Sequence, residues 1–258
     1  MEISPGKAPK LSFITLLSYD YRYALRAIRS FYQIADEIIL GLDADRVTWK
    51  HNPFEIDMFE VNGNIRKFDS EGKVRVVEGN FHKTEHPSVN ETRERAELSL
   101  LCDPGNWIVQ IDCDEMLLNP GEFRDWLFAT DPKECVLARW ISIFKIFGQR
   151  ALVIHPATEW APVATRLRGQ YTVGRWTAEK SVESPLQLLH FSWGRSRDEL
   201  RQKLENWGHA GEFDIEAFLR FWDSVTLDNY QQFRDFHPIQ PGLWPSLTVG
   251  SFKWADGT

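Results

Sequence analysis

Apolar runs alternate with amphipathic segments in the first half of the chain. Residues 11–18 (LSFITLLS) and 36–43 (DEIILGLD) are nearly continuous apolar runs, typical of parallel strands covered on both faces. Between them, apolar residues recur at helical spacing from Ala24 to Tyr32, behind Asp20, a candidate N-cap. This strand–helix–strand opening predicts an α/β fold with a mostly parallel sheet.

The same alternation continues toward the middle of the chain. Residues 44–72 mix charge with Asn and Gly and are expected to form loop or short helix, whereas residues 73–80 (KVRVVEGN) predict a third strand. SVNE reads as a capping box between Ser88 and Glu91, which opens a helix that runs to about Leu101. A fourth apolar run, WIVQI, then follows.

The second half of the chain is more mixed and irregular. Its β-like segments are residues 135–147, 150–176 and 186–194. A capping box at Ser196 and Glu199 begins a helix, and a last helix from Asp214 to about Trp222 precedes a Pro-rich aromatic tail. Because no repeat or low-complexity linker interrupts the chain, we expect one domain over residues 1–258.

Composition narrows the possible partners. The net charge of −7 argues against a broad electrostatic grip on nucleic acid, so an anionic ligand needs a metal or a few placed arginines. The three cysteines form no C-x-x-C pair, which fits a reducing cytoplasm. No apolar run approaches the roughly 18 residues of a spanning helix, so we expect a cytoplasmic protein, with peripheral membrane association left open.

Three acidic residues, Asp112, Asp114 and Glu115, directly follow the fourth strand. Open α/β sheets bind ligands at the carboxyl ends of their strands, and carboxylates this close repel unless a cation lies between them. Hard oxygen ligands select Mg²⁺ or Mn²⁺, whose other positions are commonly filled by phosphate oxygens. The alternative is that these acids only mark a strand end and cap the next helix.

The N-terminal half, Leu11 to about Pro120, resembles family 2-type glycosyltransferases of the GT-A fold, closest to the lipopolysaccharide-core group. The likeness lies in LSFITLLSYDYRYALRAIRSFYQIADEIILGLD, NETRERAELSLL and NWIVQIDCDEML. It implies a metal-dependent, inverting transfer of a sugar from a UDP- or GDP-sugar to a glycan or glycolipid. It also implies a nucleotide-sugar-binding half (about 11–120), an acceptor-side half (about 121–195) and a helical extension (196–258).

The resemblance implies which residues bind the donor nucleotide. In that family the first strand and the Asp that ends the second strand contact the nucleoside, which here gives Thr15, Leu17 and Asp43. An Asn/Arg-bearing helix start helps to hold the donor, which gives Arg93. The stretch after Asp43 is ADRV rather than small and polar, so the details of nucleoside contact are left open.

The resemblance also implies the metal and diphosphate residues. Asp112 and Asp114 would serve Mn²⁺ or Mg²⁺ and the diphosphate, and His190, after a core strand, would complete the metal shell. A buried histidine satisfied by the backbone is the alternative for His190. Arg195 and Lys203 are candidates to meet the diphosphate, or else they lie on a solvated helix face.

An inverting transferase also needs a carboxylate that deprotonates the acceptor hydroxyl. Glu159 and Glu179 are the candidates, because both lie in the aromatic, irregular second half. The chain has 11 tryptophans, and aromatic faces stack on the C–H faces of sugars. The candidate acceptor platform is Trp160, Trp176 and Trp193, with core packing as the alternative.

Two other functions are compatible with parts of the sequence. A sugar-phosphate nucleotidyltransferase uses a related core, although no Gly-rich phosphate loop follows the first strand. A catalytically silent carbohydrate-binding protein would retain the fold without nucleotide dependence. HKTEH, from His82 to His86, matches a zinc-peptidase pattern, but Pro87 disfavours the helix that this pattern needs, so we expect a loop near the donor pocket.

Overall fold

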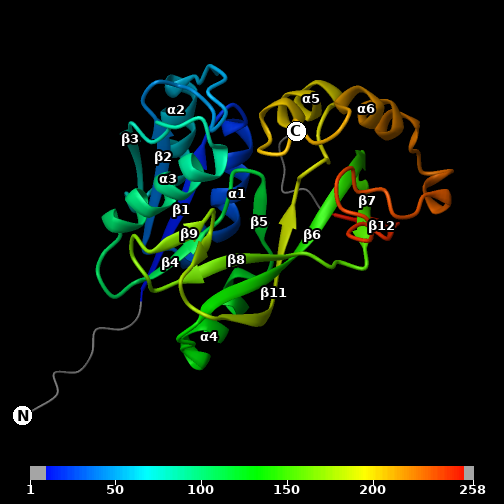
Figure 1. Ribbon diagram of the computed structural model, residues 1–258. Helices are drawn as coiled ribbons and strands as arrows, with labels where there is room; N and C mark the ends of the chain where they lie inside the picture. The colour runs from blue at the N-terminus through cyan, green and yellow to red at the C-terminus, as the bar shows by residue number, and fades with distance from the viewer. Residues whose placement is uncertain (1–9, 253–258) are drawn as a thin grey trace, which may run out of the picture.

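The first half of the computed structural model, which describes residues 10–252, is built on a parallel sheet (Figure 1). Four strands pair in parallel in the order β3-β2-β1-β4: β1 (Leu11–Leu17), β2 (Glu37–Asp43), β3 (Val74–Gly79) and β4 (Trp107–Gln110). The apolar runs of β1, β2 and β4 are buried because helices cover both faces of this sheet, whereas β3 lies at its edge and is only partly buried. The predicted α/β fold with a mostly parallel sheet is confirmed.

Helices on opposite faces of the sheet bury its two sets of alternating side chains. The face that carries Phe13 packs against α1 (Tyr21–Phe31), α2 (Met58–Phe68) and α4 (Pro120–Thr130). The other face packs against α3 (Pro87–Leu101). Gly41 lets α3 approach closely, because a Cβ there would collide with the Leu98 side chain. The sequence analysis did not predict α4.

The start of α3 differs from the prediction. The helix begins at Pro87 behind His86, which is its N-cap and makes no side-chain capping hydrogen bond. Ser88 therefore lies inside the first turn, and the predicted Ser88–Glu91 capping box is wrong. Proline at the first helical position needs no amide partner and has a preset φ, which accounts for the earlier start.

The two other predicted helix starts have different outcomes. Asp20 stands at the N-cap of α1 but makes no capping bond, because its carboxylate pairs with Arg195 at 3.0 Å. The predicted capping box of α5 (Arg197–Asn206) is confirmed: the Ser196 side chain accepts from the Glu199 amide, and the Glu199 side chain accepts from the Ser196 amide.

Strands that pair mostly antiparallel extend the sheet in the second half of the chain. They are β5 (Glu115–Leu117), β6 (Cys135–Phe147), β7 (Arg150–His155), β8 (Trp160–Thr165), β11 (Ser181–His190) and β12 (Ser246–Ser251), with β9 (Tyr171–Val173) and β10 (Trp176–Thr177) as a separate hairpin. β8 pairs with β4, and β6, β7 and β12 continue the sheet outward; β11 pairs in parallel with β6. The β12 strand lies in residues 196–258, which were expected to form a helical extension.

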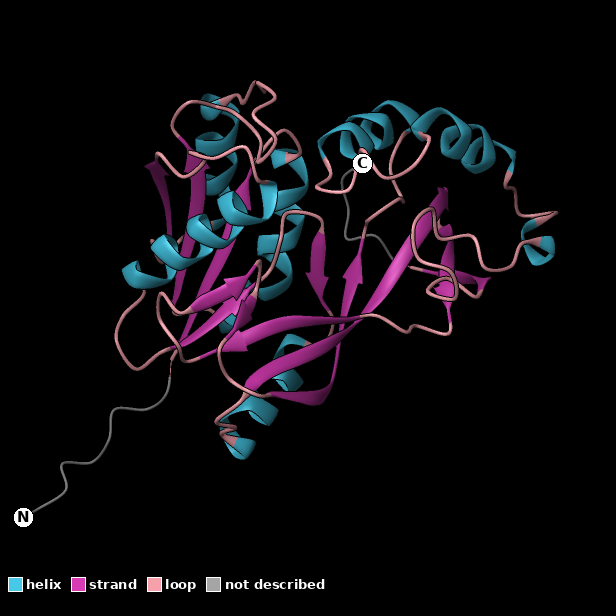
Figure 2. Cartoon of the chain, viewed as in Figure 1, coloured by secondary structure: helices cyan, strands magenta, loops and turns pink. Residues whose placement is uncertain are grey.

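The C-terminal helices form a second apolar core beside these outer strands (Figure 2). The helices are α5 and α6 (Ile215–Ser224), with two short 3₁₀ segments elsewhere, η1 (Tyr32–Ile34) and η2 (Tyr230–Gln232). Phe144 of β6 and Trp244 before β12 are buried against Leu200 and Trp222 of these helices. The described helices include none that is long and apolar enough to cross a bilayer.

Candidate functional site

A cavity of about 470 Å³ lies at the carboxyl ends of β1 and β4, where open α/β sheets bind their ligands. The predicted residues that line it are Leu17, Asp112, Asp114, Glu159, His190, Trp193 and Lys203. The predicted residues that do not line it are Thr15, Asp43, Arg93, Trp160, Trp176, Glu179 and Arg195. The side chains at this end are charged and closely paired, and we call Asp112, Asp114, Arg175, His190 and Lys203 the polar end.

Asp112 is held by two buried arginines. Nη2 of Arg95 donates to both carboxylate oxygens at 3.0 Å, and Arg175 forms an ion pair with Oδ2. Burial opposes ionisation of Asp112, but Arg175 and then Arg95 outweigh it and hold the pKa of this carboxyl below its ordinary value. Both oxygens of Asp112 are therefore already engaged by guanidinium groups.

Asp114 is held by a second set of cations. Its Oδ2 accepts a hydrogen bond from Nη2 of Arg195 at 2.6 Å and another from Nζ of Lys203, and Nε2 of His190 lies 3.6 Å away. Burial again opposes ionisation, but Lys203, His190 and Arg195 hold the pKa of Asp114 well below its ordinary value. Arg195 is only 5% exposed and lies behind the cavity wall, whereas Lys203 reaches the cavity.

Glu115, the third acid of the cluster, is fully buried. Its carboxylate accepts from Nη2 of Arg175 at 2.8 Å and from Nε1 of Trp140 at 2.7 Å, and it also accepts from the Asp112 amide at 2.9 Å. Arg175 thus bridges Asp112 and Glu115. The sequence predicted a cation among these acids, but it did not identify Arg95 and Arg175 as part of that cation set.

The predicted metal trio does not converge as a ready-made site. Among the described residues, no three His, Cys, Asp or Glu side chains are grouped to hold a metal ion. Both oxygens of Asp112 accept from arginines, and Oδ2 of Asp114 accepts from Arg195 and Lys203, so either carboxylate would exchange these partners for a metal ion. Asp114 differs in having an imidazole beside it: its Oδ2 lies 3.6 Å from Nε2 of His190 at the cavity wall, and Trp140 stacks on this imidazole at 4.5 Å. Nδ1 of His190 is buried and has no hydrogen-bond partner within residues 10–252, so the described backbone does not satisfy this ring nitrogen.

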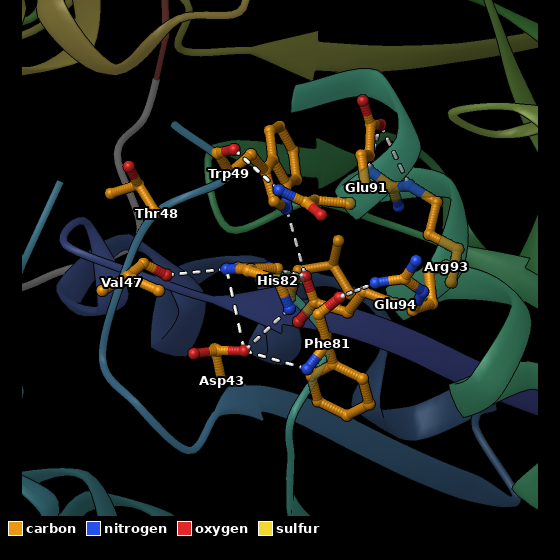
Figure 3. A network of polar contacts seen from close by, with 12 residues as sticks. Asp43, Val47, Thr48, Trp49, Phe81, His82, Glu91, Arg93 and Glu94 are labelled. Carbon is orange, nitrogen blue, oxygen red and sulfur yellow. Dashed lines mark hydrogen bonds and ion pairs between the residues drawn. The ribbon is translucent and has the colours of Figure 1, made fainter. Parts of the chain in front are cut away.

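Asp43 organises a loop rather than facing the cavity (Figure 3). Its Oδ2 accepts from the amides of Phe81 and His82 at 2.9 and 3.1 Å, and its side chain is 1% exposed. Arg93 donates from Nη1 to the Phe81 carbonyl at 3.1 Å. Both residues therefore position the segment after β3, and His82 of this segment lines the cavity.

His82 connects this loop to α3. Its Nδ1 lies 2.7 Å from the Val47 carbonyl oxygen and its Nε2 lies 3.0 Å from Oε2 of Glu94, which also accepts from Nε1 of Trp49. Since both ring nitrogens face acceptors, the doubly protonated imidazolium satisfies both contacts. Burial opposes protonation, but Glu94, Val47 and Asp43 raise the pKa of His82 above its ordinary value.

The raised pKa of His82 predicts a pH-dependent stability. Protonated His82 contributes fully to the free energy of unfolding below the pKa of the unfolded state, about 6.5. This contribution is lost as pH rises through the higher pKa of the folded state, and the free energy of unfolding then falls by at most about 1.4 kcal/mol per pH unit. We expect urea unfolding between pH 6 and pH 9 to show this loss in the wild type. H82Q removes the titrating group, so its deficit in unfolding free energy should be largest at pH 6. A deficit that is equal at all pH values would contradict the assignment.

Glu159 and Glu179 occupy different environments. Oε2 of Glu159, in the cavity wall, accepts from Oγ of Ser142 and from Nε1 of Trp244, each at 3.2 Å. Glu179 accepts from Oγ1 of Thr165 and Oγ1 of Thr177 and does not line the cavity. Of the two candidate bases, only Glu159 is placed where it can meet a ligand in this cavity.

The predicted tryptophan platform is brought together only in part. Trp193 lines the cavity, whereas Trp160 lies beneath the Arg139 guanidinium at 4.2 Å and Trp176 is 40% exposed on β10. Four tryptophans that were not part of the predicted platform also line the cavity: Trp49, Trp140, Trp207 and Trp244. Residue type alone could not separate these from the other tryptophans.

Comparisons with known proteins give only distant structural likeness. No family model and no curated protein matches the sequence. Glucosyl-3-phosphoglycerate synthase from Mycobacterium tuberculosis, in complex with Mn²⁺, UDP and phosphoglyceric acid, matches with a TM-score of 0.31 and 18% identity over 52% of this chain and 43% of that chain. The apo structure of the bifunctional glycosyltransferase WbbM matches with a TM-score of 0.29 and 12% identity over 54% of this chain and 24% of that chain. This chain therefore spans less than half of either structure, and likeness at this level assigns no activity.

Proposed function

We propose that this protein is a glycosyltransferase that moves a sugar, with inversion, from a UDP- or GDP-sugar to a glycan or glycolipid acceptor. The observation that carries the proposal is the polar end of the cavity, where Asp114, His190 and Lys203 face one space at the carboxyl ends of the strands. A nucleoside diphosphate is an anion, and a protein with a net charge of −7 can bind it only where basic side chains are grouped. The polar end provides such a group of basic side chains.

The chain's own residues supply separate parts of the transfer. Lys203 places an ammonium group where negative charge develops on the leaving diphosphate. Glu159 takes the proton from the acceptor hydroxyl; the acceptor oxygen then bonds to the anomeric carbon as the bond from that carbon to the diphosphate oxygen breaks, and the diphosphate leaves with the electron pair. Direct displacement of this kind inverts the anomeric centre.

Asp114 and His190 are the residues that would hold a divalent ion. Carboxylate oxygen and imidazole nitrogen together suit Mn²⁺, and Mg²⁺ is the alternative that favours oxygen ligands. Such an ion, when bound, supplies charge neutralisation to the phosphates of the donor. Lys203 already contacts Asp114. When the donor binds, Lys203 therefore either contacts both Asp114 and a phosphate, or leaves Asp114 for the phosphate.

A thermal-shift screen tests the proposal. At nucleotide concentrations near 100 times Kd, we expect UDP or GDP with Mn²⁺ to raise the melting temperature by about 5–10 °C, because such binding stabilises by about 2.7 kcal/mol. Mn²⁺ alone and nucleotide alone are the controls, and slow hydrolysis of the matching nucleotide sugar is the second readout.

Two other outcomes would replace the proposal. Stabilisation by glycans with no response to any nucleotide would indicate a carbohydrate-binding protein. Turnover of a nucleoside triphosphate with a sugar 1-phosphate would instead indicate a nucleotidyltransferase.

A further inference from the structure

The cavity has a second, aromatic end, which we define as Trp193, Trp207, His237 and Trp244. Their rings form a closed circuit of edge-to-face contacts, with centroid distances of 5.5 Å for Trp193–Trp207, 6.5 Å for Trp207–His237, 4.4 Å for His237–Trp244 and 5.2 Å for Trp244–Trp193. All four residues come from the segment after β11. The C-terminal segment thus supplies one wall of a cavity whose other wall is the strand ends.

Polar groups lie among these rings. Nδ1 of His237 accepts from the amides of Ile239 and Gln240 at 3.2 and 2.8 Å, so the ring proton of the neutral imidazole is on Nε2, which is a donor. Burial and the nearby His209 lower the pKa of His237, which favours this neutral form. Nε1 of Trp193 is buried and has no hydrogen-bond partner among the described residues.

Glu159 joins the aromatic end to the polar end. Its carboxylate accepts from Nε1 of Trp244, within the ring circuit, and from Oγ of Ser142 on β6. Ser142 is the direct register partner of His190 on β11, which belongs to the polar end. A ligand that lies against the rings is therefore next to the candidate base and one strand away from the donor residues.

We infer that the aromatic end is the binding subsite for the acceptor sugar. Its role as an acceptor subsite rests on the proposed function. A pyranose ring offers C–H faces with partial positive charge, which complement the negative faces of indole rings, and hydroxyl groups, which need fixed donors and acceptors. Trp207, which is half-buried, supplies the aromatic surface, and His237 and Trp193 supply N–H donors. Glu159 supplies an oxygen that accepts a hydrogen bond from the sugar, and the buried Trp244 holds this carboxylate through its Nε1.

Saturation-transfer NMR with simple sugars tests this subsite. The probes are the methyl glycosides of glucose, galactose and mannose, measured with and without UDP or GDP and Mn²⁺. We expect at least one glycoside to bind, and W207A and H237Q each to raise its Kd about tenfold or more, equivalent to about 1.4 kcal/mol. W176A, which removes a tryptophan outside the cavity, is the matched control and should leave this Kd unchanged.

The result that would overturn the subsite is distinct from failure of the proposed function. If no glycoside binds the wild type under either condition, or if W207A and H237Q bind like W176A, the aromatic end is not a sugar subsite. If glycoside binding depends on Trp207 but the protein binds no nucleotide, the sugar subsite is supported and the proposed transferase activity is contradicted. Circular dichroism of W207A and H237Q separates loss of binding from loss of fold.

Discussion

Replacement of Arg175 by methionine is expected to lower the unfolding free energy by about 3–5 kcal/mol, because it removes one partner of a buried ion pair. The Arg175 guanidinium joins Asp112 and Glu115, and Glu115 has no exposure to water. Burial lowers the pKa of Arg175, but Asp112 and Glu115 outweigh it and raise this pKa above its ordinary value. Without the guanidinium, the donors that remain to Glu115 in the described part of the chain are the Trp140 indole and the Asp112 amide, both neutral.

Urea unfolding at neutral pH measures this effect. The double variant R175M/E115Q should recover part of the loss, because it removes both members of the pair and leaves no unpaired charge between them. R124M is the matched control, since Arg124 pairs with Asp125 at the exposed surface, and it should unfold like the wild type. An R175M protein as stable as R124M would show that the buried cluster does not hold the fold.

Replacement of Asp114 by asparagine is expected to lower transfer by about 100-fold or more and to abolish the response of nucleotide binding to Mn²⁺. The isosteric amide keeps the shape of the side chain but removes the charge that Arg195, Lys203 and His190 face. Arg195 retains Asp20 as a partner, and Lys203 is partly exposed, so the fold should survive.

Calorimetric titration of UDP and GDP, with and without Mn²⁺, measures the nucleotide response in the Asp114 variant. D125N, on the surface of α4, is the matched control and should bind nucleotide like the wild type. K203M tests the same site while leaving Asp114 paired with Arg195, so it should weaken nucleotide binding without changing the fold. Tight binding by a folded D114N protein that still responds to Mn²⁺ would contradict the donor site.

The sequence predicted those helices and strands that depend on interactions between residues close together in the chain. Nearly continuous apolar runs predicted β1 and β2 because both faces of these strands are covered, and the Ser196–Glu199 box predicted α5 because its two bonds are made within one turn. The start of α3 was missed by two residues, because the N-cap is His86 rather than Ser88 and Pro87 starts the helix without the help of the Ser88 side chain.

Long-range pairing accounts for what the sequence did not predict. The position of Asp112 and Asp114 follows from the end of β4. The cations that pair with Asp112 come from α3 and from the β9–β10 hairpin, and those that pair with Asp114 are Arg195 and Lys203, which lie far along the chain. The sequence around these basic residues does not indicate which acidic residue each of them pairs with. Asp43 illustrates the opposite case: its place at the end of β2 was predicted, but its hydrogen bonds go to the loop after β3.

The most direct test of the donor site is a crystal structure with Mn²⁺ and whichever of UDP and GDP stabilises the protein more. The account predicts a diphosphate at the polar end, within hydrogen-bonding distance of Nζ of Lys203, with the metal ion bound by Asp114 and His190. Nucleotide bound elsewhere, or an empty polar end with Lys203 still paired to Asp114 at saturating nucleotide, would contradict it.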